Sequence, residues 1–257
     1  INQTYPNLEI IIIDDNSMDT SIEKIQKWKQ QFKELINFIP LKENRGISCV
    51  RNIGLKNSTG EFVTYLDGDD YFYADKIEKD VNYLENNPNS DVVFSNFNIV
   101  DSYNKILDKW ELNSIPNEIF LAVISRDFPK NMLFRNETIR KRIIEKNYLY
   151  DEKLKVYEDW DFRIRYSKNF NIGFNNFIGS AYRKHTDGLS KKTKRKLLLS
   201  QEKEIFNKNK NLLNDYPNNL RKPIINKMNH YFSLKKAKNI KRKIEYISIA
   251  KHLIKYP

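Results

Sequence analysis

Residues 61–72 read EFVTYLDGDDYF, which places three carboxylates directly after a segment that favours β structure. Asp67, Asp69 and Asp70 surround a single glycine. Carboxylates this close repel one another unless a cation or a set of hydrogen-bond donors compensates their charge. Oxygen ligands of this kind suit Mg²⁺ or Mn²⁺, and Mg²⁺ is commonly held by one or two carboxylates together with substrate phosphates. A solvated acidic turn accounts for the same residues, so this stretch alone leaves both interpretations open.

The 60 residues before this stretch alternate between strand-like and helix-like patterns. The segment LEIIIID is a continuous apolar run that predicts a buried parallel strand. The predicted elements, in the order strand, helix, strand, helix, are 8–14, 21–32, 35–41 and 47–58. Connections of this type predict a mostly parallel, doubly wound α/β sheet. Because ligands bind beyond the carboxyl ends of such strands, we expect Asp14 and Asp15 to approach Asp67.

The remainder of the first 188 residues continues the alternation less regularly. Helices are predicted at 74–88 and from Glu158 onward, and strands at 91–101 and 172–185. Residues 102–131 are weakly patterned. Glu158 and Asp159 fall at a helix start, where the helix dipole favours acidic residues irrespective of any catalytic role.

Charge is distributed unevenly along the 257 residues. The net charge is +12, and the segment from Leu189 to the end holds 19 of the 45 Lys and Arg residues but only 4 of the 33 Asp and Glu residues. The sequence therefore predicts a nearly neutral domain over 1–188 and a basic, helical extension over 189–257. The extension could be a solvated helical surface, could bind an anionic membrane face, or could bind nucleic acid; the last is disfavoured because aromatic interleaving is lacking.

Two further features limit the class of protein. The single cysteine, Cys49, excludes a disulfide framework and a cysteine-rich metal site, and it is typical of a reducing compartment. No run approaches the roughly 18 apolar residues of a membrane-spanning helix. We therefore expect a cytoplasmic protein, either soluble or peripheral on the inner face of the membrane.

Four motifs, taken together and in order, resemble the inverting family-two glycosyltransferases of GT-A fold. They are IIIDDNSMD, ENRGISCVRNIGLKNSTGEFVTYLDGDDYF, YEDWDFRIR and YRKHTDGLS. The resemblance covers about residues 1–188 and implies a GT-A nucleotide-sugar transferase domain. It also implies a first β-strand ahead of INQTYPN that this sequence does not contain, so we expect an N-terminally shortened form of the domain.

The resemblance implies roles for individual positions. Asp15 corresponds to the residue that hydrogen-bonds the nucleotide base, Asp67 to the one directed toward the ribose, and Asp159 to the catalytic base, with Glu158 beside it. The implied metal ligands are Asp69, Asp70 and His185. The implied nucleotide-binding residues are Asp14, Asp15, Asn16, Ser17, Asn44, Gly46, Arg51, Asn52 and Asp67.

The implied reaction is a metal-dependent transfer of a sugar from a nucleotide-sugar donor, with UDP as the expected nucleotide and Mn²⁺ or Mg²⁺ as the cofactor. An acceptor hydroxyl, deprotonated by Asp159, would attack the opposite face of the anomeric carbon and invert it. The expected acceptor is a glycan or a lipid-linked glycan of bacterial cell-surface polysaccharide synthesis. Two alternatives remain: a catalytically impaired nucleotide-binding or scaffold protein of the same fold, and a basic membrane-binding module.

Overall fold

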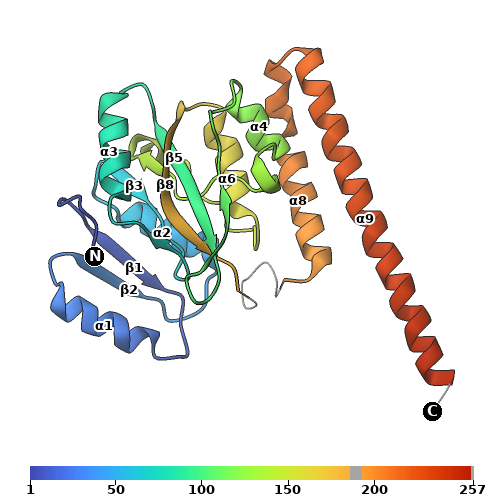
Figure 1. Ribbon diagram of the computed structural model, residues 1–257, viewed down its shortest axis with the longest axis horizontal. Coiled ribbons are helices and arrows are strands. Elements are labelled where there is room, and N and C mark those ends of the chain that lie inside the picture. Colours follow the sequence, from blue (N-terminus) through green and yellow to red (C-terminus); the bar gives the residue numbers. More distant parts are fainter. Residues whose placement is uncertain (186–192, 256–257) are drawn as a thin grey trace. The chain divides into compact units, whose positions relative to one another are not determined.

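The structure is a computed structural model that describes residues 1–185 and 193–255, with side chains described up to residue 238. The chain divides into two compact units, Ile1–Thr186 and Asp187–Pro257. The predicted domain boundary at residue 188 lies outside the described residues, and it stays a prediction. Figure 1 shows the succession of elements along the chain.

The first unit opens with a two-stranded parallel sheet. Strands β1 (Ile10–Asp14) and β2 (Ile36–Pro40) pair from Ile10 opposite Ile36 to Asp14 opposite Pro40. Helix α1 (Ser21–Gln31) connects them, because parallel neighbours need a crossover rather than a tight turn. Helix α2 (Ile47–Asn57) follows β2 and packs on β1. These elements agree with the predicted order.

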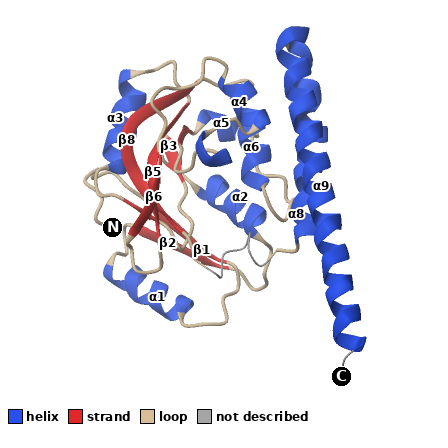
Figure 2. Cartoon of the chain, turned by 45° about the vertical axis from the view of Figure 1, so that its right-hand side comes forward, coloured by secondary structure: helices blue, strands red, loops and turns tan. Residues whose placement is uncertain are grey.

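A six-stranded sheet forms the centre of the unit. Its path is β3–β7–β5–β8–β4, and β6 pairs with β5 beside that path. The strands are β3 (Phe62–Thr64), β4 (Tyr71–Phe72), β5 (Val92–Val100), β6 (Ile106–Trp110), β7 (Thr138–Arg140) and β8 (Ile172–Arg183). In Figures 1 and 2 the long strands β5 and β8 run side by side, with α3 (Lys76–Asn86) and α6 (Glu158–Ser167) on opposite sides of them.

The α/β fold class is as predicted, but the expected mostly parallel pairing needs correction. Only β1–β2 and β5–β8 pair in parallel among the described strands, whereas β3–β7, β4–β8, β5–β6 and β5–β7 are antiparallel. The reason lies in the connections. β6 returns from β5 through a short turn, which can only produce an antiparallel neighbour, and β7 is inserted between β3 and β5 against the direction of both.

The core is built around β5, in which all nine residues are buried. Phe94 stacks on Phe134 with ring centroids 4.1 Å apart, and Phe97 stacks on Trp110 at 5.1 Å. All four side chains are fully buried, and burial of one such side chain contributes about 1.5–3 kcal/mol. This rigid centre supports the loops that follow β3 and β8 and the start of α6.

The segment between β5 and α6 contains short elements. They are α4 (Ile119–Ser125), the 3₁₀ turn η1 (Pro129–Asn131) and α5 (Arg142–Glu145). Helix α4 packs on α6, where the Trp160 indole N–H donates to the Val123 carbonyl at 2.9 Å. The weakly patterned region thus includes an edge strand and a short buried helix.

The second unit is helical over most of its described residues. It contains α8 (Arg195–Asn209), the 3₁₀ segment η2 (Lys210–Asp215) and α9 (Asn218–Lys255). Glu202 of α8 is almost fully buried and accepts hydrogen bonds from Lys235 and Tyr231 of α9. None of the described helices is long and apolar enough to cross a membrane.

Candidate functional site

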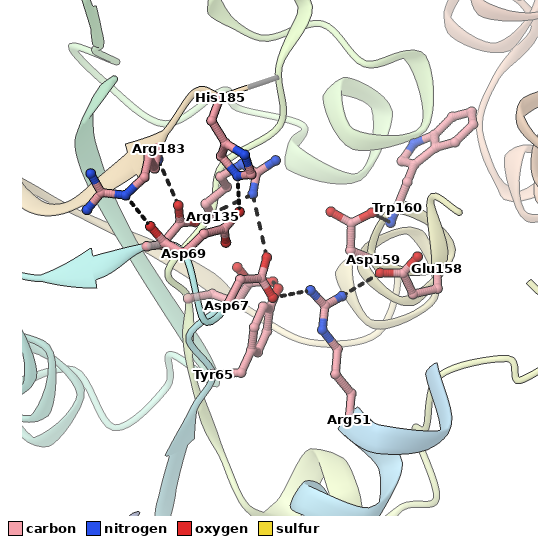
Figure 3. Close-up of polar contacts among 12 residues, drawn as sticks. Arg51, Tyr65, Asp67, Asp69, Arg135, Glu158, Asp159, Trp160, Arg183 and His185 are labelled. Atoms are coloured by element: carbon pink, nitrogen blue, oxygen red, sulfur yellow. Dashed lines mark hydrogen bonds and ion pairs between the residues drawn. The ribbon is translucent and has the colours of Figure 1, made fainter. Parts of the chain in front are cut away.

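One arginine links the Asp-x-Asp loop, residues 67–70 between β3 and β4, to the Glu-Asp pair, Glu158 and Asp159 at the start of α6. Arg51 projects from α2, and its Nη2 donates to Oδ1 of Asp67 at 2.8 Å while its Nη1 donates to Oε1 of Glu158 at 2.6 Å. Figure 3 shows the guanidinium between the two carboxylates. The structure therefore brings together residues that are 16 and 107 positions apart in the sequence.

The loop between β3 and β4 is held by the end of β8. The backbone N–H of Arg183 donates to Oδ1 of Asp70 at 2.8 Å, and Nε of Arg183 donates to the Asp69 carbonyl at 2.8 Å. Nε2 of His185 lies 2.8 Å from Oδ2 of Asp69 (Figure 3). The three residues predicted to bind metal thus lie in one small region, supported by an arginine from the same strand end as the histidine.

Asp159 is held by a buried cation. Nη1 of Arg163, one helical turn later, donates to Oδ2 of Asp159 at 2.5 Å. Arg163 is in turn paired with the fully buried Glu137, through Nε to Oε1 at 2.8 Å and Nη2 to Oε2 at 3.0 Å. The Tyr65 hydroxyl also donates to Glu137. The side chain of Asp159 remains 28% exposed while that of Glu158 is only 6% exposed, so Asp159 is the acid that solvent or a substrate can reach.

The two adjacent acids have pKa values displaced in opposite directions. Burial, followed by repulsion from Asp159, raises the pKa of Glu158 to about 7. Burial would also raise the pKa of Asp159, but the positive charges of Arg163, Arg51 and Arg135 together hold it well below its ordinary range. Asp159 is therefore the ionised member of the pair near neutral pH.

A third displaced pKa belongs to the Asp-x-Asp loop. Burial raises the pKa of Asp70 to about 6, against the stabilising effects of the Arg183 backbone N–H and the Arg135 guanidinium. Negative charge on Asp67 and Asp69 adds to the rise. The crowded carboxylates expected from the sequence are thus present, and further positive charge would favour the ionised form of Asp70.

Residues of the Asp-x-Asp loop and of the Glu-Asp pair line one pocket. Asp67, Asp70, Asp159 and Arg51 all contribute to its walls. The lining residues are Arg51, Tyr65, Leu66, Asp67, Asp70, Phe72, Arg135, Asn136, Asp159, Arg163, Ser180 and Tyr182. The convergence of two predicted motifs on one pocket is the observation on which the functional argument rests.

The predicted base-binding residues form a second cluster, where β1 and β2 end. Asp15 accepts the backbone N–H groups of Arg45 and Gly46 at 2.7 and 2.9 Å, and the Asn44 side chain donates to the Asp15 carbonyl at 3.2 Å. Gly46 has a φ of 82°, a conformation that glycine adopts readily. The cluster therefore connects the turn after β1 with the start of α2.

The other residues of this turn are arranged around Asp14. The buried Asp14 accepts the backbone N–H of Ser17 at 2.9 Å, and Asn16 is exposed with a φ of 63°. Asn52 is different, because it is buried and its side chain bonds Tyr150 and Glu152. The structure thus does not bring Asn52 to the acidic pocket, although it follows Arg51 directly.

Several site residues were missed by sequence reasoning. Arg135 lines the pocket 3.9 Å from Asp67 and 4.0 Å from Asp70, and its guanidinium lies 4.0 Å from the centre of the Tyr182 ring. Nothing in the pattern around residue 135 distinguishes it. Arg163 and Arg183 could have been found, because they stand inside the quoted motifs YEDWDFRIR and YRKHTDGLS.

The residues near Asp69 fit a divalent metal, although no three His, Cys, Asp or Glu side chains among the described residues are grouped closely enough to hold an ion on their own. Oδ2 of Asp69 and Nε2 of His185 point at each other and are both partly exposed. Carboxylate oxygens suit Mn²⁺ or Mg²⁺, imidazole is a common metal ligand in proteins, and substrate phosphates commonly complete a Mg²⁺ site. The donor set is thus suited to a metal that binds together with a nucleotide diphosphate.

Comparison with known proteins decides the family. The family model for glycosyl transferase family 2 matches residues 1–187. The chain belongs to this family. It is 33% identical over 165 residues to an uncharacterised glycosyltransferase of Methanocaldococcus jannaschii, covering 64% of this chain and 56% of that protein. It is 42% identical over 88 residues to one of Haemophilus influenzae, covering 34% of each. The chain thus spans between a third and just over half of these relatives.

Two solved structures have the same fold as this chain. One is Staphylococcus aureus TarS, residues 1–349, in complex with UDP, with a TM-score of 0.66 and 19% identity, covering 90% of this chain and 65% of that one. Another is the mannosyltransferase PcManGT of Pyrobaculum calidifontis in complex with GDP-Man and Mn²⁺, with a TM-score of 0.58 and 15% identity, covering 99% and 74%. These similarities confirm the predicted GT-A fold.

Proposed function

We propose that the protein transfers a sugar from a nucleotide-sugar donor, UDP-linked, to a hydroxyl of a glycan or lipid-linked acceptor, with inversion at the anomeric carbon. The observation that carries the proposal is the pocket shared by the Asp-x-Asp loop and Asp159. Membership of a glycosyltransferase family, and the UDP or GDP-Man named with the solved structures of the same fold, support a nucleotide-sugar as the donor.

Each residue has a role in this proposal. Asp15 and its neighbours receive the base, and Asp67 faces the ribose. Asp69 and His185 would hold the metal with Asp70 in support, and a bound ion would supply positive charge next to the departing diphosphate. Arg135 adds a positive charge on the same side of the pocket.

Asp159 accepts the proton of the acceptor hydroxyl as that oxygen attacks. Its carboxylate is ionised and partly exposed, and it is fixed by Arg163. A low pKa makes it a weak base, but the hydroxyl becomes acidic only as the bond to the sugar forms, so proton transfer late in the attack is favourable. Since the attacking oxygen comes from the acceptor and no covalent enzyme intermediate is needed, a single displacement inverts the anomeric centre.

The proposal of a lipid-linked acceptor rests on the positive charge of the residues after Leu189. The basic residues after Leu189 would attract an anionic membrane face, where a lipid-linked acceptor of cell-surface polysaccharide synthesis would be presented. Exposed residues of the weakly patterned segment, including those of β6, are proposed to recognise the acceptor glycan.

The test is turnover. The 257-residue chain is incubated with Mn²⁺ and a panel of UDP-sugars, with and without short glycan acceptors, and UDP release is measured. NMR of any product reports whether the new linkage has the opposite anomeric configuration to the donor. Retention of configuration would contradict inversion. UDP binding without turnover of any sugar would favour a non-catalytic nucleotide-binding protein.

A further inference from the structure

Arg51 makes a set of contacts that a donor-binding side chain would not need. Its two terminal nitrogens bond Asp67 and Glu158 at 2.8 and 2.6 Å, and its guanidinium carbon lies 4.8 and 5.4 Å from the ring centres of Tyr65 and Tyr150. The side chain is only 11% exposed. Both ends of the guanidinium fork are thus occupied by protein carboxylates (Figure 3), and two tyrosine rings lie close to it.

These contacts join three elements, of which the last lies about a hundred residues further along the chain than the first two. Arg51 comes from α2, Asp67 from the loop after β3, and Glu158 from the first residue of α6. A guanidinium is planar and rigid, so two hydrogen bonds from one fork fix the separation of their acceptors. A lysine at the same position presents a single ammonium on a flexible chain and cannot hold both acids in the same geometry.

The start of α6 needs such support. Tyr157, the residue before the helix, has a φ of 60°, in the left-handed region that is unfavourable for a bulky side chain. Backbone of this kind persists where surrounding contacts fix it. Glu158 follows directly, and Asp159 is the next residue, so a contact that fixes Glu158 also fixes the direction from which Asp159 enters the pocket.

We propose that Arg51 is a positioning residue that ties the Asp-x-Asp loop to the start of α6 and thereby sets the distance between the bound donor and Asp159. The inference rests on the proposed function. It differs from the expectation that Arg51 contacts the nucleotide, because here its effect is on the alignment of donor and base rather than on donor affinity.

The kinetic test compares Arg51→Lys with Arg140→Lys. Arg140 is a matched control, since it is 12% exposed, pairs with Glu61 at 3.0 Å and lies over the Phe62 ring, but does not line the pocket. Misplacement of a catalytic group by about 1 Å costs about 100-fold in rate. We expect Arg51→Lys to lower kcat by about 100-fold with KM changed less than about threefold, and Arg140→Lys to leave both unchanged.

A double-variant cycle separates positioning from independent contributions. Because Arg51 acts through Glu158, the Glu158→Gln variant should show part of the same loss, and Arg51→Lys combined with Glu158→Gln should lose little more than Arg51→Lys alone. If the kcat losses of the two single variants multiply in the double variant, the proposal is overturned. A normal kcat for Arg51→Lys would also overturn it, as would a loss entirely in KM, which would return Arg51 to donor binding.

A measurement without turnover distinguishes failure of this inference from failure of the proposed function. Amide hydrogen exchange is followed by mass spectrometry on peptides covering residues 157–165 in the complete chain. Arg51→Lys should speed exchange there by at least about tenfold, and Arg140→Lys should not. If the wild-type chain turns over no UDP-sugar but this exchange difference is found, the proposed function fails and the structural link stands. Unchanged exchange in Arg51→Lys overturns the link itself.

Discussion

Replacement of Glu137 by glutamine should destabilise the first unit strongly, because it breaks a buried ion pair beneath the pocket. Glu137 is fully buried and receives two hydrogen bonds from Arg163, at 2.8 and 3.0 Å, and one from Tyr65 at 2.8 Å. The glutamine keeps the size of the side chain but removes its charge. Arg163, 2% exposed, then keeps Asp159 as its one anionic partner among the described side chains.

The loss can be estimated from the behaviour of buried pairs. Removal of one partner of a buried ion pair leaves an uncompensated charge and costs about 3–5 kcal/mol. Because Asp159 still compensates part of the charge of Arg163, we expect a loss of about 3 kcal/mol. With a urea dependence of about 1–3 kcal/mol/M, the unfolding midpoint should fall by about 1–3 M. The assay is equilibrium urea unfolding at pH 7, followed by the fluorescence of the buried Trp110 and Trp160.

Glu61→Gln provides the control for this experiment. Glu61 pairs with Arg140 at a similar distance, 3.0 Å, but is 72% exposed, so its loss should cost less than about 1 kcal/mol. Equal midpoints for the Glu137 and Glu61 variants, or a shift below about 1 kcal/mol for Glu137→Gln, would refute the argument that the buried pair supports the pocket floor.

Two further predictions concern ionisation and metal. The pKa of Glu158 is raised from 4.5 to about 7 in the folded state. Between these pH values the folded chain therefore binds more protons than the unfolded chain. The free energy of unfolding should fall as pH rises from 5 to 8. Glu158→Gln should remove this part of the slope, and an identical pH dependence of urea midpoints would contradict it. Asp69→Asn should weaken Mn²⁺-dependent UDP binding at least about tenfold, as measured by calorimetry. Asp108→Asn is the control, because Asp108 is an exposed acid paired with Lys130, and it should leave the affinity unchanged. Equal UDP affinities of the two variants would exclude Asp69 as a metal ligand.

The fold was predictable where the pattern is local. The apolar run of β1 and the helical periodicity of α1, α2 and α3 have a clear sequence signal, and the motifs identified the family. The direction of strand pairing was not predictable, because β7 is only three residues long and its place between β3 and β5 is set by side chains distant in sequence. The predicted helical extension is confirmed over its described residues, whereas the domain boundary at residue 188 remains a prediction.

The candidate site also contains residues that the sequence predicted and residues that it did not. The acids were found because carboxylates at strand and helix ends form a visible pattern, and the structure brings Asp67, Asp70 and Asp159 to one pocket. Arg135 was missed because its position depends on packing over Tyr182, which no spacing rule predicts. The link from Arg51 to Glu158 spans 107 residues, and such long-range contacts are decided by the tertiary fold.

The central claim is that Asp159 acts as the base toward a sugar bound beside the Asp-x-Asp loop. The most direct measurement is the kcat of UDP release, with Mn²⁺ and the best UDP-sugar and acceptor of the panel, for the wild-type chain and for Asp159→Asn. Since a positioned general base contributes about 10²- to 10⁴-fold, we predict a loss in that range with UDP affinity unchanged. A wild-type kcat in Asp159→Asn would contradict the account.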